Sequence, residues 1–300
     1  MILVLTNLLG CSSVQARIVL GFACVAVAAG AAGCGRHAQV VGHGPTKVVA
    51  AFYPLAYAAQ EIGGAAVTVE NLTPPGAEPH DVELSPREVA DVIRADLVLY
   101  LGGGFQPAVE RAVGRRHGPS LDLARAAAEE RPGRTADPHV WLDPVRYARM
   151  ARAVGAALGR PARAAAFAGR ALALDRAYRR GLARCARREL LTSHAAFGYL
   201  AARYGLRQVA LEGLAPEAEP GPRAVRRLVE AVRRARATTV LTETLASPRL
   251  ARTVAREAGV RTAVLDPLEG LTVERQARGT TYFTVMRANL RVLRRALGCR

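Results

Sequence analysis

Residues 161–188, PARAAAFAGRALALDRAYRRGLARCARR, decide how the rest of the chain is organised. Their apolar positions recur at a loosely helical spacing, and no strand-like run interrupts them. A helix of about 28 residues spans roughly 40 Å at 1.5 Å per residue, which exceeds the diameter of a small domain. In the middle of a chain, such a helix predicts a rod that joins two lobes.

Short apolar runs alternate with helical segments on both sides of this stretch. Most of the runs are rich in Val or Leu, and they lie at 48–52, 66–72, 96–101, 139–142, 189–193, 238–242 and 261–265. Continuous apolar runs are typical of strands buried on both faces, and strand–helix alternation indicates mainly parallel sheets. The sequence therefore predicts an α/β fold of two lobes, 47–158 and 189–300, joined by a linking helix at 159–188.

The charge of the chain is strongly basic, with a formal net charge of +17. Almost all of the excess is arginine, since Lys47 is the only lysine, and the arginines are spread along helical segments. Nucleic-acid binding favours clustered Lys and Arg with interleaved aromatics, whereas only 5% of these residues are aromatic. We therefore expect arginine-rich outer helix faces and no nucleic-acid partner.

The N-terminus has the pattern of a processing segment. Residues 18–33, IVLGFACVAVAAGAAG, carry no charge and follow Arg17. This run is shorter than the ~20 residues of a membrane-spanning helix and fits the apolar region of a secretory signal. Ala31-Ala32-Gly33-Cys34 resembles a bacterial lipobox, although Leu8-Leu9-Gly10-Cys11 is a second match. We expect a signal segment at 1–34 with lipidation at Cys34, then a polar tether at 35–46; an ordinary signal peptide is the alternative.

Two cysteines remain after this segment, Cys185 and Cys299. They could form a disulfide in an oxidising compartment. The chain contains no Cys-x-x-Cys pair, which argues against a zinc site of the finger type.

Three histidines and one aspartate stand near the ends of strand-like runs. His80 follows such a run across a Pro-rich turn, His194 ends one, and Asp266 closes another. His139 opens a run instead and meets the pattern less clearly. In parallel α/β sheets, ligands bind beyond the carboxyl ends of the strands, so side chains from both lobes could meet in the cleft between them.

Three imidazoles and one carboxylate form a compact set that suits Zn²⁺ in tetrahedral geometry, whereas Ca²⁺ or Mg²⁺ would need mostly oxygen ligands. Each ring also needs an acceptor that fixes its tautomer. The nearby candidates for that role are Glu78, Asp81, Asp143 and Glu243. A histidine at a strand end is also a common structural residue, so the residues alone leave both interpretations open.

Four segments that carry these residues resemble one known family. They are Pro74–Asp81 (PPGAEPHD), Asp137–Pro144 (DPHVWLDP), Ser193–Leu200 (SHAAFGYL) and Leu265–Leu268 (LDPL). They are similar to the metal-binding receptors of bacterial ABC importers for zinc and manganese, and the likeness covers nearly the whole mature chain. The chain departs from many zinc members in one respect: residues 115–134 hold only His117 in place of a His/Asp-rich loop.

The resemblance implies two α/β lobes that hold one transported metal ion between them. It implies a binding protein and no enzyme: an extracytoplasmic, lipid-anchored monomer whose partners are an ABC permease and its ATPase. The ligands it implies are His80, His139, His194 and Asp266. Manganese receptors tend to carry Glu at the third ligand position, so His194 favours Zn²⁺. A manganese receptor of this family and a metallohydrolase with a three-histidine zinc site are the alternatives.

Overall fold

The computed structural model describes residues 44–127, 137–211, 222–245 and 247–300, and His43–Arg300 forms one compact unit. The expected signal segment, the lipidation at Cys34 and most of the tether lie outside these residues. None of the helices that the structure describes combines the length and the apolar character that crossing a membrane requires.

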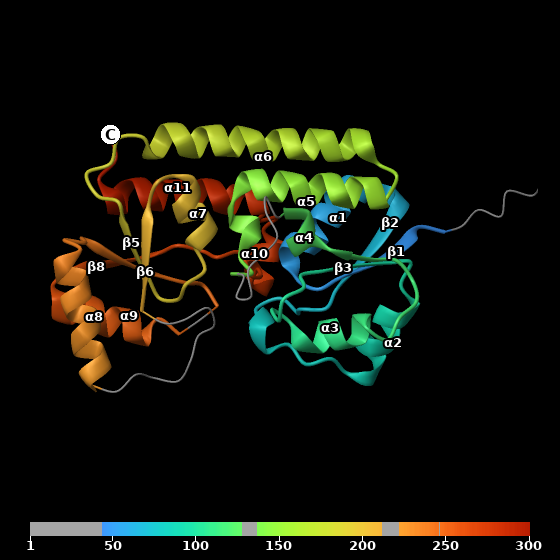
Figure 1. The fold of residues 1–300 in the computed structure, drawn as a ribbon, viewed down its shortest axis with the longest axis horizontal. Helices are drawn as coiled ribbons and strands as arrows, with labels where there is room; N and C mark the ends of the chain where they lie inside the picture. Colours follow the sequence, from blue (N-terminus) through green and yellow to red (C-terminus); the bar gives the residue numbers. More distant parts are fainter. Residues whose placement is uncertain (1–43, 128–136, 212–221, 246) are drawn as a thin grey trace, which may run out of the picture. The chain divides into compact units, whose positions relative to one another are not determined.

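Two four-stranded sheets, each with only parallel pairings between its strands, form the framework (Figure 1). The first has the order β2-β1-β3-β4, and the second has the order β6-β5-β7-β8. The strands are β1 (Thr46–Ala50), β2 (Val67–Asn71), β3 (Leu97–Tyr100), β4 (Ser120–Asp122), β5 (Glu189–Thr192), β6 (Arg207–Ala210), β7 (Thr239–Thr242) and β8 (Arg261–Val264). The predicted α/β class with parallel sheets is therefore confirmed.

Helices connect and cover the strands. Those of the first half are α1 (Tyr53–Gly63), α2 (Pro86–Arg94), α3 (Pro107–Val113), α4 (Leu123–Ala127) and α5 (Pro144–Ala157). The others are α6 (Pro161–Leu182), α7 (Gly198–Arg203), α8 (Pro222–Arg234), α9 (Arg249–Ala258), α10 (Val273–Ala277) and α11 (Tyr282–Leu297). Short 3-10 turns form at η1 (Gly64–Ala66), η2 (Pro79–Asp81) and η3 (Val140–Leu142).

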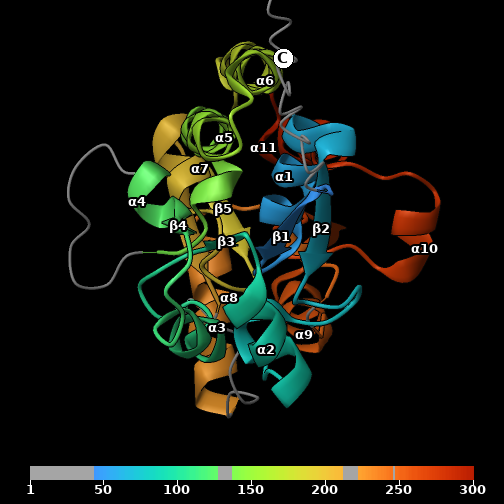
Figure 2. The ribbon, with the colours of Figure 1, turned by 90° about the vertical axis from the view of Figure 1, so that its right-hand side faces the viewer.

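The longest helix, α6, packs on helices from both halves of the unit. It lies along the top of Figure 1, above α5 and α11, and Figure 2 shows α6 and α5 nearly end-on. Arg163 donates to the carbonyl of Ile62 in α1, whereas Tyr178 donates to that of Met286 in α11. These contacts agree with a helix that joins two lobes; the lobe boundaries themselves stay a prediction.

The linking helix ends earlier than we expected, at Leu182 rather than Arg188. Arg188 folds back and donates to the carbonyl oxygens of Leu182 and Ala183, which caps the helix end. Cys185 is bonded to Cys299, which confirms the pairing that the sequence left open. This disulfide joins the end of α6 to the segment that follows α11.

One predicted strand is wrong. Val140–Leu142 form the 3-10 turn η3, and the backbone of His139 is not extended (φ −76°, ψ 38°). Prolines on both sides of the run, at 138 and 144, lack the N–H group that a strand ladder needs. The apolar character of the run instead reflects burial, since Trp141 is fully enclosed.

Two edge strands were missed. β4 and β6 lie at sheet edges and are only partly buried, with polar residues such as Ser120 and Gln208. Edge strands need not be apolar throughout, so these segments gave no continuous apolar run.

Candidate metal centre

Four side chains from four separate loops converge on one point. His80 lies in η2 beyond β2, and His139 directly precedes η3. His194 follows β5, and Glu269 lies beyond β8. The parallel sheets direct the ends of β2, β5 and β8 toward this point, which is where such folds place ligands. Among the described residues, these four are the group of His, Cys, Asp and Glu that could hold a metal ion.

The four potential donor atoms lie within 4.8 Å of one another. One oxygen of Glu269 contacts the Nε2 atoms of His139, His80 and His194 at 2.9, 3.3 and 3.4 Å. The Nε2 atoms of His139 and His194 are 3.4 Å apart. Tetrahedral zinc with bonds of ~2 Å separates its ligand atoms by about 3.3 Å, so the arrangement fits such an ion with little adjustment.

The centre is almost closed to solvent. The side chains of His139, His194 and Glu269 are at most 1% exposed, whereas that of His80 is 10% exposed. The phenyl ring of Phe105 packs edge-on against His80, with ring centroids 4.7 Å apart. Solvent therefore reaches the cluster mainly on the side of His80.

Two carboxylates hold the far sides of two imidazole rings. Asp137 lies 2.7 Å from Nδ1 of His139 and also accepts from its backbone N–H. Glu243 lies 2.6 Å from Nδ1 of His194 and accepts from its backbone N–H and from the hydroxyl of Ser193. A carboxylate on Nδ1 leaves Nε2 free to face the common point and increases the basicity of the ligand.

These contacts also set the charges of the side chains in the centre. Burial lowers the pKa of His194, but Glu243 and Glu269 outweigh the burial and raise the pKa to about 10. Burial likewise disfavours the charged form of His139, yet Asp137 and Glu269 raise its pKa. Burial opposes ionisation of Glu269, but its contacts with the three imidazoles hold its pKa well below the usual value. The four side chains thus form a buried ion-paired network.

Asp266, the carboxylate expected in this set, is not part of the cluster. One of its oxygens accepts from the backbone N–H of Leu268 at 2.8 Å, and the other pairs with the guanidinium of Arg275 in α10. The carboxylate that faces the three histidines belongs instead to Glu269, three positions later. The local reason is that Asp266 forms an ion pair with Arg275 in α10. Arg275 does not lie at a strand end, so the pattern used for the prediction gave no sign of this pair.

Asp266 instead shapes the loop that presents Glu269. Asn289 in α11 bonds both the N–H and the C=O of Asp266, at 3.0 and 2.7 Å. The chain then turns through Leu268, which has a positive φ of 57°, a conformation that is uncommon for a branched side chain. The turn directs Glu269 toward the histidines.

Contacts through Trp141 tie the loops from the two halves together. Its indole N–H donates to the carbonyl of Pro267 at 2.8 Å, and its own carbonyl accepts from the hydroxyl of Tyr282 at 2.7 Å. A further backbone bond joins Gly76 to Leu271 at 2.9 Å, which links the His80 loop to the Glu269 loop.

The remaining predicted carboxylates have mixed outcomes. Glu243 contacts a ring as favoured, whereas Asp143 caps the start of α5 and pairs with Arg203 at 2.6 Å. Glu78 accepts from the backbone of His80 at 3.5 Å, and Asp81 is exposed. Asp137 was not among the predicted acceptors, although its place two residues before His139 is a signal in the sequence.

Comparison with known proteins agrees with this geometry. The family model described as zinc-uptake complex component A, periplasmic, matches residues 48–296. The zinc-binding lipoprotein AdcA of Streptococcus pneumoniae is 34% identical over 278 residues, which cover 84% of this chain and 56% of the relative. The high-affinity zinc uptake system protein ZnuA of Bacillus subtilis is 31% identical over 277 residues, covering 83% and 87%.

A solved structure, the Zn(II)-bound ZnuA-like domain of Streptococcus pneumoniae AdcA, superimposes with a TM-score of 0.74 at 34% identity. The match covers 85% of this chain and 99% of that domain. The chain spans a little over half the length of the AdcA relatives that it matches. From the extent of the family match and these identities, we conclude that the chain belongs to the family of the periplasmic component A of zinc-uptake complexes.

Proposed function

We propose that this protein is an extracytoplasmic receptor that captures one Zn²⁺ ion between its two halves and delivers it to the permease of an ABC importer. The observation that carries the proposal is the convergence of three imidazoles and the Glu269 carboxylate within 4.8 Å of one another. The ligands are then His80, His139, His194 and Glu269. The ion is cargo and undergoes no reaction.

The donor set favours zinc over other biological cations. Three neutral imidazoles and one carboxylate give a borderline-soft set of four, which matches tetrahedral Zn²⁺. Mn²⁺ prefers more oxygen ligands and a larger coordination number, so a manganese receptor is the second candidate within the family. Relatives named for zinc binding or zinc uptake support the first choice.

The same count argues for binding rather than catalysis. A catalytic zinc keeps one position open for water, whereas four protein ligands close the tetrahedron. The burial of three of the four ligands leaves little room for a substrate beside the ion. A hydrolase with a three-histidine site would need Glu269 to act as a base on a water molecule, instead of binding the metal.

Family membership also supports a proposal for where the protein acts. We propose that residues 1–34 are an export segment, that Cys34 carries a lipid, and that residues 35–46 tether lobes at 47–158 and 189–300 to the membrane. The lipoprotein name of the pneumococcal relative supports this arrangement. The protein then acts as a monomer beside its permease and the ATPase that drives import.

The experiment that tests the metal site compares two carboxylates from one loop. Purified protein is analysed for bound metal and titrated with Zn²⁺ against a chelator of known affinity. We expect about one ion per chain and a loss of at least about 1,000-fold in affinity for Glu269→Gln, since a charged ligand is removed. Asp266→Asn keeps an oxygen for the Leu268 N–H and is expected to bind far more tightly than Glu269→Gln.

Each rival has its own signature in the same material. A tighter affinity for Mn²⁺ than for Zn²⁺ would support the manganese alternative. Zinc-dependent hydrolysis of an ester or phosphoester, lost in His139→Ala, would support the hydrolase. Equal loss of affinity in Asp266→Asn and Glu269→Gln would contradict the ligand set proposed here.

A further inference from the structure

The second half of α6 and the adjoining α11 are rich in exposed arginine and poor in acidic residues. Helix α11 contains no Asp or Glu, and the single acid of α6, Asp175, is largely buried and paired with Arg179 at 2.9 Å. Seven arginines of this region are exposed, and we call them the α6–α11 basic face. They are Arg176, Arg180, Arg184, Arg287, Arg291, Arg294 and Arg295.

The seven side chains form two adjacent rows. Arg176 and Arg180 are four residues apart on α6, and Arg184 follows just beyond the end of that helix. Arg287 and Arg291 repeat the spacing of four on α11, so each row follows one side of its helix. The rows adjoin because a Cβ added to Gly181 would lie 3.3 Å from Cδ of Arg294. The disulfide Cys185–Cys299 holds the two ends of the face together.

None of these seven arginines forms an ion pair with a carboxylate of the residues that the structure describes. Other arginines differ: Arg125 in α4 pairs with Asp122 at 3.0 Å, and Arg170 in the first half of α6 pairs with Glu61 at 2.6 Å. Uncompensated like charges on neighbouring helices repel one another and weaken the folded state. Such a face therefore has most to gain from an external anion.

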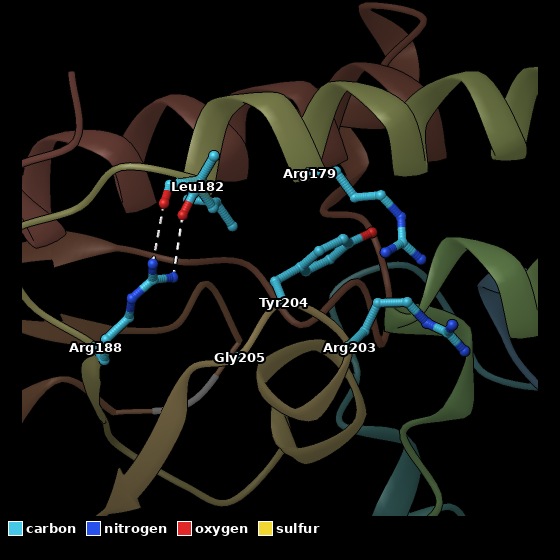
Figure 3. Close-up of a pocket in the computed structure, with 7 residues that line it drawn as sticks. Arg179, Leu182, Arg188, Arg203, Tyr204 and Gly205 are labelled. Atoms are coloured by element: carbon cyan, nitrogen blue, oxygen red, sulfur yellow. Dashed lines mark hydrogen bonds between the residues drawn. The ribbon is translucent and has the colours of Figure 1, made fainter.

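A hollow of about 570 Å³ lies beside this face under the end of α6 (Figure 3). Arg179 points from α6 toward Tyr204 and Arg203, which lie at the end of α7. Two of the arginines that line it are already balanced, because Arg179 pairs with Asp175 and Arg203 with Asp143. Arg188 is the third and donates to two carbonyls at the end of α6. The hollow thus adds little net charge, and the exposed face dominates the local field.

We propose that the α6–α11 basic face docks on the anionic lipid surface of a membrane. A lipid surface offers many phosphates in one plane, which matches two parallel rows of arginine better than a single anion would. The large aromatics of both helices, Phe167, Tyr178, Tyr282 and Phe283, are buried, so the face offers no rings on which nucleic-acid bases could stack. Docking does not depend on which metal the centre binds.

The test uses the full chain with vesicles of phosphatidylcholine alone or with phosphatidylglycerol added. The quantity measured is the ratio of partition coefficients on the two lipids, because the apolar segment at 18–33 contributes to both. The face variant carries Arg176→Gln, Arg180→Gln, Arg291→Gln and Arg295→Gln. The control carries Arg223→Gln, Arg226→Gln, Arg227→Gln and Arg252→Gln, which remove the same charge from α8 and α9.

We expect the unaltered chain to prefer anionic vesicles and to lose that preference near 1 M salt, where charges are screened beyond ~3 Å. The face variant should lose about 100-fold or more in the ratio, at roughly fivefold per arginine, and the control less than about threefold. Equal losses in both variants would assign the effect to net charge and overturn the proposal. Absence of any anionic preference in the unaltered chain would overturn it too and would leave an acidic protein as the partner.

Circular dichroism and metal content, measured on each variant, show whether the fold and the metal centre are retained. A chain that binds no zinc yet keeps its lipid preference would contradict the proposed function and leave the docking surface supported.

Discussion

The metal centre and the α6–α11 basic face both contain many charged groups. The charges are balanced by partners in the centre and are unbalanced on the face. In the centre, every buried acid and imidazole contacts a group that balances it, as Glu269 does with three histidines. On the face, seven arginines are exposed to solvent, and none of them forms an ion pair with a carboxylate of the residues that the structure describes. The difference shows that burial, rather than the number of charges, decides where pairing is required. Substitutions in the two regions should therefore differ in cost.

The largest expected effect is that of removing the disulfide Cys185–Cys299 at the edge of the basic face. Cys185→Ser with Cys299→Ser removes a link between residues 114 positions apart. A loop of that size predicts a loss of about 4–5 kcal/mol in the free energy of unfolding, since the unfolded chain gains freedom. Urea unfolding of the metal-free protein measures it. Unchanged stability would mean that packing between α6 and α11 suffices to hold the face.

The next prediction compares a buried ion pair outside the metal centre with the exposed basic face. Arg203→Met breaks the pair with Asp143, whose side chain is 2% exposed, and should cost about 3 kcal/mol because a buried carboxylate loses a partner. Arg291→Met, on the basic face, should change stability little. Thermal and urea unfolding compare the two variants. Similar costs at both positions would remove the distinction drawn between the regions.

A smaller effect on Zn²⁺ affinity is expected from the two carboxylates that contact the Nδ1 atoms of His139 and His194. Asp137→Asn and Glu243→Gln keep the shape of the groups that hold His139 and His194 but remove their charge. We expect each to weaken Zn²⁺ binding about 10–100-fold, as is usual for groups that orient a metal-bound imidazole. Glu83→Gln, at a side chain 86% exposed, is the control. If Glu83→Gln bound Zn²⁺ as weakly as either variant, the loss of affinity would reflect the overall charge of the protein.

The smallest effect is a dependence of affinity on pH. The pKa of His194 is about 10 in the metal-free protein, so this ring is protonated at pH 7, whereas zinc needs it neutral. Binding at pH 7 should release at least one proton, and affinity should rise about tenfold per pH unit for each proton released. Calorimetry in two buffers of different ionisation enthalpy counts the protons. Glu243→Gln, which removes a cause of the raised pKa, should reduce that count; identical heats in both buffers would contradict the prediction.

The sequence was sufficient for the fold class because the central strands are continuous apolar runs, as at Val48–Ala50 and Leu97–Leu99. It failed where local pattern and tertiary role diverge. The run at 139–142 is apolar because Trp141 is buried in the core and not because it pairs in a sheet. The partly exposed strands β4 and β6 left no such run at all.

For the site, three histidines could be found because few others occur in the chain and these stand near strand ends. The fourth position could not be assigned, since two acids three residues apart both follow β8. Only the partner decides between them: Arg275 takes Asp266, and the turn at Leu268 points Glu269 inward. Periodicity in the sequence carries no information about that long-range choice.

The hydrogen bonds through Trp141 have a consequence for how the proposed receptor would bind and release its metal ion. The indole of Trp141 joins the His139 loop to the Glu269 loop by a hydrogen bond between protein atoms, so this contact holds the spacing of these two proposed ligands independently of a metal ion. His80 is the proposed ligand with the most solvent contact, so its side chain is the one that would move as the ion binds or leaves. In the proposed receptor, the rate of metal binding and release would be set by rotation of the His80 imidazole and by Phe105, which packs against it. It would not be set by a large movement of the two halves.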